Sequence, residues 1–148
     1  MTSDPPSERF LLDTHVWIWY VEADERMFGP AVQKALMASN AGPGLWVSVM
    51  SAWEVAMLDS KGRVQLSMAA PTWIERSLSR PGIRLADLTP AVAIESARLP
   101  EFGHRDPVDQ ILVATARVTG ATLVTRDRRI LDYAARGYLR VLDATPNV

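Results

Sequence analysis

Cysteine is absent from this sequence of 148 residues, so disulfide bonds and thiolate metal sites are excluded. The absence is typical of the reducing cytoplasm, where we expect the protein to act. Long apolar runs are absent too, because none approaches the roughly 18 residues of a membrane-spanning helix. The polar stretch 1–8 lacks the basic start and apolar core of a signal peptide, and we expect a flexible tail there.

An excess of positive charge is also missing, since 16 basic residues face 17 acidic ones and the net charge is −1. This balance argues against nonspecific coating of nucleic acid but leaves room for a local basic rim. Lysine is scarce, with Lys34 and Lys61 the only two, so nearly all basic residues are arginines. Arginine is the better forked ligand for phosphate, although a bias in genome composition explains the same excess.

Hydrophobic residues are plentiful, at 48% of the chain, so residues 9–148 can bury the core of one domain. Short apolar runs alternate with helical patterns, which predicts an α/β fold with a mainly parallel sheet. The expected strands are 9–12, 45–49, 83–86, 121–125 and 139–142. Helical patterns cover 30–39, 51–61, 71–79, 90–99, a stretch from Pro107 onward, and 127–135.

Two acidic residues closely follow expected strands. Asp13 comes directly after the first apolar run, and Asp127 comes just beyond the fourth. Ligands of open α/β sheets bind at the carboxyl ends of the strands, so both residues are placed to meet one. Each has an alternative role as the N-cap of the following helix, which for Asp13 is expected to begin at His15.

More acids lie at expected helix starts. Glu54 is the only charge in its apolar stretch, where a carboxylate needs a cation or hydrogen bonds. Its alternative role is a capping box with Ser51. Asp106 precedes a proline and suits the N-cap of the next helix. Asp109 lies one turn farther on. Capping the helix does not require this second acid, which favours a ligand role for Asp109.

These carboxylates converge at one edge of the sheet if the strands are neighbours. Unneutralised carboxylates repel one another, and their pKa values rise. A hard divalent cation resolves this repulsion, and Mg²⁺ accepts carboxylates and waters while leaving room for a phosphate oxygen. A zinc site is not expected, because the chain has no cysteine and only two histidines.

Four short motifs occur in order within residues 9–143. They are Leu11-Leu12-Asp13-Thr14-His15, then Ser51-Ala52-Trp53-Glu54-Val55-Ala56 followed by Lys61-Gly62-Arg63-Val64, then His104-Arg105-Asp106-Pro107-Val108-Asp109 with Ala114 and Ala116 beyond it, and Leu123-Val124-Thr125-Arg126-Asp127. Each motif alone is weak, but the four in this order are specific. With them the chain resembles the PIN-domain ribonucleases, and most closely the VapC-type toxins of type II toxin–antitoxin pairs.

The resemblance implies a three-layer α/β/α fold with a sheet of about five strands, and metal-dependent cleavage of RNA to 5′-phosphate and 3′-hydroxyl ends. The implied metal is Mg²⁺, with Mn²⁺ as a substitute. The acidic metal positions match Asp13, Glu54 and Asp109, with Asp127 at a fourth, more variable position. Supporting polar positions match Thr14, Ser51 and Thr125, with Asp106 as a cap. Relatives often carry arginine where Gln110 stands, so a phosphate contact there is in doubt.

The resemblance also implies partners for this chain. They are an RNA substrate, a small VapB-like antitoxin whose C-terminal part covers the site, and a second copy in a homodimer. The candidate RNA-binding residues flank the acidic motifs and are Arg105, Arg126, Arg128 and Arg129, with a solvated charged face as the alternative. The tryptophans Trp17, Trp19, Trp53 and Trp73 are expected in the core, or partly along a groove for an antitoxin helix.

Other chemistry is less well supported by the residues. His15 and His104 are candidates for a general base, but metal-bound water needs none, so we expect capping or loop hydrogen bonds from them. Phosphotransfer through an aspartyl intermediate at Asp13 usually needs a second aspartate two residues on, where His15 stands. A PIN-like module that binds RNA or protein without cutting is usually marked by the loss of acids, and all four are present here.

Overall fold

The computed structural model describes residues 8–146, so the tail predicted at 1–8 lies outside the described residues except for Glu8. Glu8 accepts a hydrogen bond from the Thr122 hydroxyl at 2.7 Å. The elements run in the order β1 (Phe10–Leu12), α1 (Thr14–Val21), the 3-10 helix η1 (Glu25–Met27), α2 (Gly29–Asn40), β2 (Leu45–Ser48), α3 (Val49–Ser60), α4 (Ala70–Leu78), β3 (Ile83–Ala86), α5 (Pro90–Ala97), α6 (Pro107–Thr119), β4 (Thr122–Thr125), α7 (Arg128–Ala135) and β5 (Val141–Asp143).

All five strands pair in parallel, in the order β3-β2-β1-β4-β5. The central strand β1 therefore pairs with β2 on one side and β4 on the other. After β3 the chain passes through α5 and α6 and returns to the opposite side of β1. The carboxyl ends of β1 and β4 thus form a topological switch point, the place where open α/β sheets bind their ligands.

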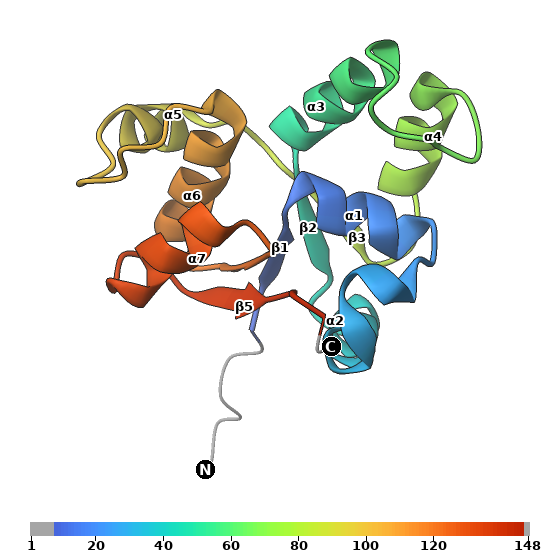
Figure 1. Ribbon diagram of the computed structural model, residues 1–148, viewed down its shortest axis with the longest axis horizontal. Coiled ribbons are helices and arrows are strands. Elements are labelled where there is room, and N and C mark those ends of the chain that lie inside the picture. The colour runs from blue at the N-terminus through green and yellow to red at the C-terminus, as the bar shows by residue number, and fades with distance from the viewer. Residues whose placement is uncertain (1–7, 147–148) are drawn as a thin grey trace.

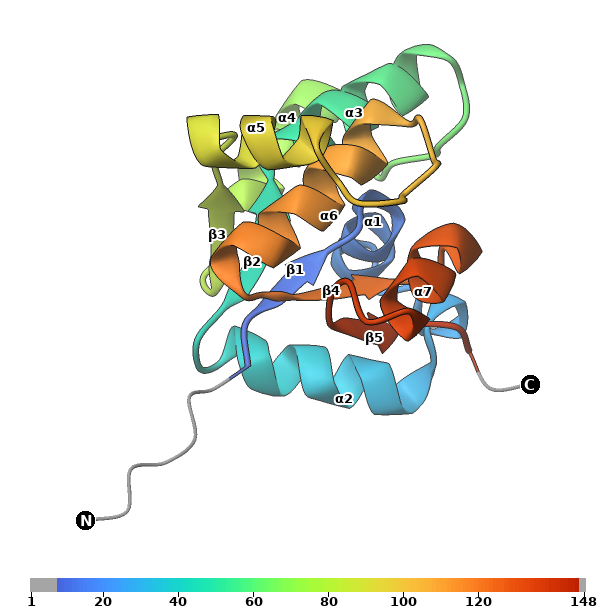
Figure 2. The same cartoon turned by 90° about the vertical axis from the view of Figure 1, so that its left-hand side faces the viewer.

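Side chains along the central strands alternate between two cores. Phe10 and Leu12 pack with residues of α1, α2, α3 and α4, whereas Leu11 packs with residues of α6 and α7. Figure 1 shows these two groups of helices on opposite sides of the sheet, and Figure 2 shows α6 crossing in front of β1. Both faces of the sheet are covered, which explains why the inner strands are apolar almost throughout.

The three-layer α/β/α arrangement and the parallel five-stranded sheet expected from the sequence are confirmed. The strand predicted at 83–86 has the observed bounds, and those predicted at 9–12, 45–49 and 121–125 each differ by one residue at one end. The last strand begins two residues later than predicted and ends one residue later, at Val141–Asp143. Residues 139 and 140 belong to the segment between α7 and β5, although the Arg140 carbonyl already accepts from the Leu123 N–H at 3.0 Å.

Trp17 and Trp73 lie at the centre of the first core. Both side chains are buried, and their ring centroids are 4.9 Å apart. The Trp17 indole N–H donates to Ser77 Oγ at 2.6 Å, and the Trp73 indole N–H donates to Glu22 Oε1 at 2.8 Å. Since a buried indole N–H needs a partner, these contacts stabilise the packing of α1 against α4. The core placement predicted for these two tryptophans is confirmed.

Trp53 is not in the core, so the core expectation is wrong for it. Its side chain is 53% exposed. The buried residues of α3 are Ser51 and Val55, and Trp53 stands about half a turn away from both. Within residues 8–146, no helix combines the length and the apolar character needed to cross a membrane.

Candidate functional site

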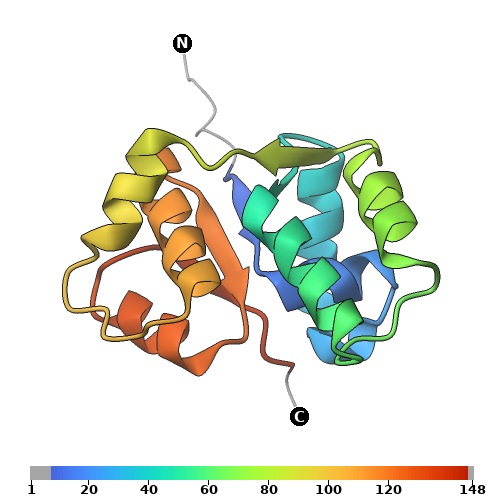
Figure 3. The same ribbon diagram turned by 90° about the horizontal axis from the view of Figure 1, so that it is seen from above.

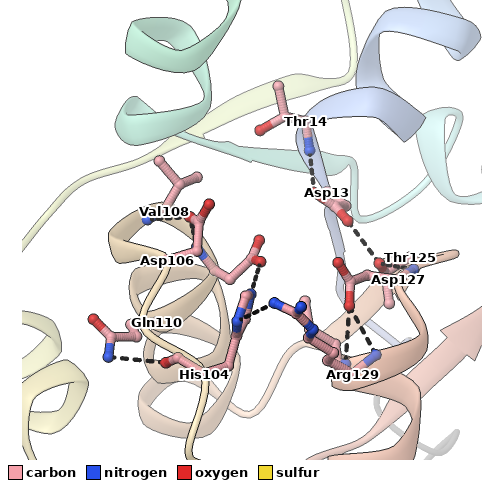
Figure 4. Close-up of polar contacts among 11 residues, drawn as sticks. Asp13, Thr14, His104, Asp106, Val108, Gln110, Thr125, Asp127 and Arg129 are labelled. Atoms are coloured by element: carbon pink, nitrogen blue, oxygen red, sulfur yellow. Dashed lines mark hydrogen bonds and ion pairs between the residues drawn. The ribbon is translucent and has the colours of Figure 1, made fainter.

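The switch point of the sheet brings two of the predicted acids together. Asp13 directly follows β1, and its backbone N–H donates to the Val124 carbonyl of β4 at 3.0 Å. Asp127 lies two residues beyond β4. Figure 4 shows the side chains of Asp13 and Asp127 near each other, with Thr125 between them.

Thr125 connects these two acids through one hydroxyl group. The Thr125 hydroxyl donates to Asp13 Oδ2 at 2.6 Å and accepts from the Asp127 backbone N–H at 2.9 Å. The other oxygen of Asp13 accepts from the Thr14 N–H at 2.7 Å and caps α1. The capping role considered for Asp13 is therefore real, and it coexists with a position at the carboxyl edge of the sheet.

Glu54 reaches the same region from α3, but not through the predicted capping box. Helix α3 begins at Val49, and the Ser48 hydroxyl at the end of β2 caps it by accepting from Met50 N–H at 3.1 Å. Ser51 therefore lies inside the helix, where it cannot act as the cap. Its buried hydroxyl instead accepts from Thr14 Oγ1 at 2.9 Å, which ties α1 to the first turns of α3.

Helix α6 supplies two further acids. Asp106 is its N-cap and accepts from the backbone N–H groups of Val108 and Asp109 at 2.9 and 3.1 Å, as predicted. Asp109 lies in the first turn and is partly buried. Its Oδ2 atom is 2.6 Å from Nε2 of His104, a residue in the loop that precedes the helix.

Helix α7 begins beside α6 at this edge. Asp127 is its N-cap and accepts from the backbone N–H groups of Arg129 and Ile130 at 2.9 and 3.2 Å. The capping role considered for Asp127 is therefore confirmed. The Arg129 guanidinium turns back to His104, with its Nη1 atom 2.8 Å from the imidazole Nδ1.

Ligand atoms of His104, Asp109 and Asp127 all lie within 4.8 Å of one another, and no other such trio is found within residues 8–146. The predicted trio of Asp13, Glu54 and Asp109 is therefore not gathered as tightly. The side chains are nevertheless electrostatic neighbours, because the charge of Asp13 acts on both Glu54 and Asp109. Viewed from above in Figure 3, α6 lies beside the start of α3, whereas α5 and α4 lie at opposite ends of the view.

Burial dominates the electrostatics of these carboxyl groups. It raises the pKa of Asp13, although hydrogen bonds from Thr125 and Thr14 partly offset the rise. It also raises the pKa of Glu54, and the charge of Asp13 adds to that rise. For Asp109, burial raises the pKa to about 7, although a hydrogen bond from His104 lowers it.

No lysine or arginine side chain forms an ion pair with Asp13, Glu54, Asp109 or Asp127 in the part of the chain that the structure describes. A group of partly buried carboxylates without such partners is electrostatically unfavourable when ionised. The predicted ligands all supply carboxylate oxygens. Such a set suits a hard divalent cation, which removes the mutual repulsion.

The candidate RNA-binding arginines differ in their surroundings. Arg105 and Arg128 are exposed. Arg126 donates to the Met27 carbonyl at 2.9 Å and lies over the Trp19 ring, 5.0 Å from its centroid. Arg129 is engaged by His104, so two of the four candidates already have partners within the protein.

His104 is the residue whose position sequence reasoning missed. Helix capping or a loop hydrogen bond is the expectation for His104, whereas its side chain contacts a predicted metal ligand. Gln110, the departure from the family pattern, donates its side-chain amide to the His104 carbonyl at 3.1 Å. One signal in the sequence could have indicated this contact. His104 and Gln110 lie only six residues apart, on either side of the Asp106 cap, so the loop can fold back onto the first turn of α6.

Comparison with known proteins places the chain in a family. The family model described as the PIN domain matches residues 10–136. Ribonuclease VapC22 of Mycobacterium tuberculosis (strain ATCC 25618 / H37Rv) is 33% identical over 120 residues, covering 81% of this chain and 88% of that protein.

Solved structures share the fold at lower sequence identity. The VapBC2 structure from Rickettsia felis, bound to a DNA fragment from its promoter, matches with a TM-score of 0.67 and 14% identity, over 90% of this chain and 97% of that chain. A toxin–antitoxin complex from Klebsiella pneumoniae matches with a TM-score of 0.59 and 20% identity, over 93% and 98% of the two chains. From the motifs, the fold and these matches together, the chain belongs to the PIN-domain family, among its VapC-type members.

Proposed function

We propose that this protein is a metal-dependent endoribonuclease that acts as the toxin of a toxin–antitoxin pair. The observation that carries the proposal is the group of partly buried carboxyl groups at the switch point of the sheet, which have raised pKa values and no lysine or arginine partner within residues 8–146. The relative named Ribonuclease VapC22 supports the choice of RNA as the substrate. A nuclease of this kind would act in the cytoplasm, where its RNA is found.

The residues proposed to hold the ion are Asp13, Glu54 and Asp109, with Asp127 as a fourth. A bound Mg²⁺, or Mn²⁺ in its place, lowers the pKa of a coordinated water and neutralises charge on the phosphate undergoing cleavage. Mutual repulsion among ionised carboxylates opposes a tighter grouping in the absence of a cation.

The surrounding polar residues fix the directions of these carboxylates. Thr125 and Thr14 each hydrogen bond one oxygen of Asp13 and so limit its rotation. The Thr14–Ser51 hydrogen bond holds the start of α3, and with it Glu54, against α1. Preorganisation of this kind matters for catalysis because ligands that are already oriented need less ordering when the ion and substrate bind.

We further propose that exposed arginines beside the site receive the RNA backbone. Within residues 8–146, Arg105 and Arg128 form no hydrogen bond or ion pair, whereas Arg126 and Arg129 also hold parts of the protein in place. Guanidinium groups suit this task because they pair with phosphate oxygens in a forked geometry. Binding by such contacts weakens as the salt concentration rises.

The test is RNA cleavage by Asp13→Asn and Asp109→Asn variants, with and without Mg²⁺ and after addition of EDTA. Each substitution removes a charged oxygen ligand, so we expect cleavage to fall by more than the roughly 100-fold that loss of a residue merely supporting a metal ligand can cost. Asp132→Asn is the matched control, because Asp132 is an exposed acid on α7. Cleavage by the two site variants at the wild-type rate would defeat the proposal.

The same experiment distinguishes a binding module from an enzyme. Tight RNA binding by the wild-type protein without turnover in either Mg²⁺ or Mn²⁺ would favour a PIN-like module that does not cut. An acid-labile phosphoprotein intermediate would instead favour phosphotransfer through Asp13.

We also propose a small VapB-like antitoxin as the protein partner, and a homodimer as the oligomeric state. The solved structures that share the fold include toxin–antitoxin complexes, which supports the first part. The exposed indole of Trp53, next to Glu54, offers an apolar surface where an antitoxin segment could cover the site. Co-purification with the product of a neighbouring short reading frame, followed by measurement of the mass of the complex, tests both parts.

A further inference from the structure

The imidazole of His104 lies between an acid and a base of two different helices (Figure 4). Its Nε2 atom is 2.6 Å from Asp109 Oδ2, and its Nδ1 atom is 2.8 Å from Arg129 Nη1. The side chains of His104 and Asp109 are only 13% and 16% exposed. The contact between His104 and Asp109 is therefore largely shielded from solvent, where a hydrogen bond is stronger than at the surface, whereas the contact with Arg129 is exposed.

The partners of His104 determine where its ring proton lies. Arginine has only donor groups, so the Nδ1 atom that faces Arg129 must accept and carries no proton. The proton of the neutral ring then resides on Nε2, which donates to the carboxylate of Asp109. Arg129 thus selects the one tautomer of His104 that can support Asp109.

The loop around His104 is built to hold this arrangement. The Gln110 side chain donates to the His104 carbonyl at 3.1 Å, and the His104 N–H donates to the Phe102 carbonyl at 2.7 Å. The Phe102 ring packs edge-on against the imidazole with centroids 5.6 Å apart. On the other side, Asp127 caps the backbone of Arg129. These contacts restrain His104 and its arginine partner, neither of which the proposed mechanism uses as a metal ligand.

We propose that His104 is a positioning residue that orients Asp109 for metal binding, with Arg129 fixing the tautomer that it needs. This inference rests on the proposed function, because it assigns a role within the same metal site. One oxygen of Asp109 is held by His104, which leaves the other oxygen free for the ion. The carboxylate is thereby restrained before the ion arrives, and less conformational entropy is lost on binding.

The first test is calorimetric titration of Mg²⁺ and Mn²⁺ into metal-free wild-type protein, His104→Ala and His104→Gln. Glutamine offers an amide N–H for Asp109 and a carbonyl oxygen for Arg129, so it can replace both hydrogen bonds of the neutral ring. We expect alanine to weaken ion binding by about 10- to 100-fold, and glutamine to recover most of that loss. Equal affinity in the alanine variant and the wild type would overturn the inference.

The second test reads the tautomer directly in metal-free protein labelled with ¹⁵N-histidine, at a pH above the Asp109 pKa of about 7, so that the ionised carboxylate can accept from Nε2. The chain has only two histidines, so the His104→Gln spectrum assigns the remaining signals to His15. We expect the His104 nitrogens to show a neutral ring protonated at Nε2, and Arg129→Ala to produce a mixture of tautomers. The matched control is Arg63→Ala, which removes an exposed arginine beyond the C-terminal end of α3.

The outcomes separate this inference from the proposed function. If the wild-type protein binds no divalent ion and cuts no RNA, the proposed function fails, whatever the tautomer of His104. If it binds the ion but Arg129→Ala leaves the histidine signals unchanged, only the positioning role fails. Nitrogen coupling from His104 in the electron paramagnetic resonance spectrum of bound Mn²⁺ would make it a direct ligand and overturn the positioning role. If His104→Ala does not fold, His104→Gln and Arg129→Ala carry the test.

Discussion

Thr125 is the residue on which the geometry of Asp13 and Asp127 depends most directly. It is fully buried, and its hydroxyl is shared between the Asp13 carboxylate and the Asp127 N–H. Replacement by valine keeps the shape but removes both hydrogen bonds. We expect Thr125→Val to lower the free energy of unfolding by about 1–3 kcal/mol and to reduce metal affinity, whereas Thr125→Ser retains both properties.

The matched control for this prediction is Thr122→Val. Thr122 lies on the same strand, is also buried, and donates to the remote Glu8 carboxylate. Urea denaturation compares the two valine variants in stability, and calorimetry compares them in Mg²⁺ affinity. Equal Mg²⁺ affinity in both would show that the Thr125 hydroxyl does not orient Asp13.

Individual residues also show how far the site could be predicted from the sequence alone. Asp13 and Asp127 were predictable, because an acid just beyond a buried parallel strand lies at the ligand-binding edge. The contact of His104 with Asp109 was not predictable. The direction of the imidazole ring depends on Arg129, which lies on α7, 25 residues farther along the chain. Only the folded chain brings these two residues together.

At the scale of elements, helix boundaries depend on competition between possible caps. Ser48 and Ser51 both suit an N-cap, and the local pattern favoured Ser51 through its pairing with Glu54. The structure uses Ser48, because β2 ends there and the chain turns directly into α3. Sheet pairing therefore decides a boundary that the sequence of the helix leaves open. For α6 no such competition exists, and Asp106 before a proline was predicted correctly.

Asp106 gives a prediction that separates capping from metal binding. Serine caps helices as well as aspartate does but has no charge. We therefore expect Asp106→Ala to lower the free energy of unfolding by about 1 kcal/mol, and Asp106→Ser to keep both stability and metal affinity. Thermal denaturation and Mg²⁺ titration provide the measurements.

Thr89→Ala is the control for loss of a cap elsewhere, since Thr89 caps α5 through the Val92 N–H at 3.2 Å. Its stability should fall by a similar amount while its metal affinity stays at the wild-type level. A strong loss of metal affinity in Asp106→Ser would instead make Asp106 a ligand in its own right.

At the scale of the whole molecule, the parallel sheet and its helical layers followed from the alternation of apolar runs with helical patterns. The strand order could not be predicted in this way, because no local sequence pattern indicates that β4 pairs with β1 and not with β3. That pairing creates the switch point and brings Asp127 beside Asp13. The proposed metal site is thus a product of topology, which concentrates negative charge that the chain as a whole does not carry.

This concentration of charge predicts an unusual dependence of stability on pH. In the metal-free protein the pKa of Asp109 rises from 3.8 to about 7, so over this interval the folded state holds a proton that the unfolded state has released. Stability is therefore highest at the acidic side of the interval and is lost as the pH rises through the folded pKa. The raised pKa values of Asp13 and Glu54 act in the same direction.

The measurement is the melting temperature in EDTA at about pH 5.5 and about pH 8, repeated with saturating Mg²⁺. Both values lie above the range in which Glu101 and Asp143, whose pKa values are lowered, lose their stabilising contributions. We expect metal-free protein to melt several degrees lower at the higher pH, Asp109→Asn to reduce that difference, and Asp132→Asn to leave it unchanged. Mg²⁺ should reverse the trend, because the ion competes with protons for the same oxygens and binds only the folded site. A metal-free protein that grows more stable over this range would show that its carboxylates are already compensated, and would remove the electrostatic reason for a bound cation.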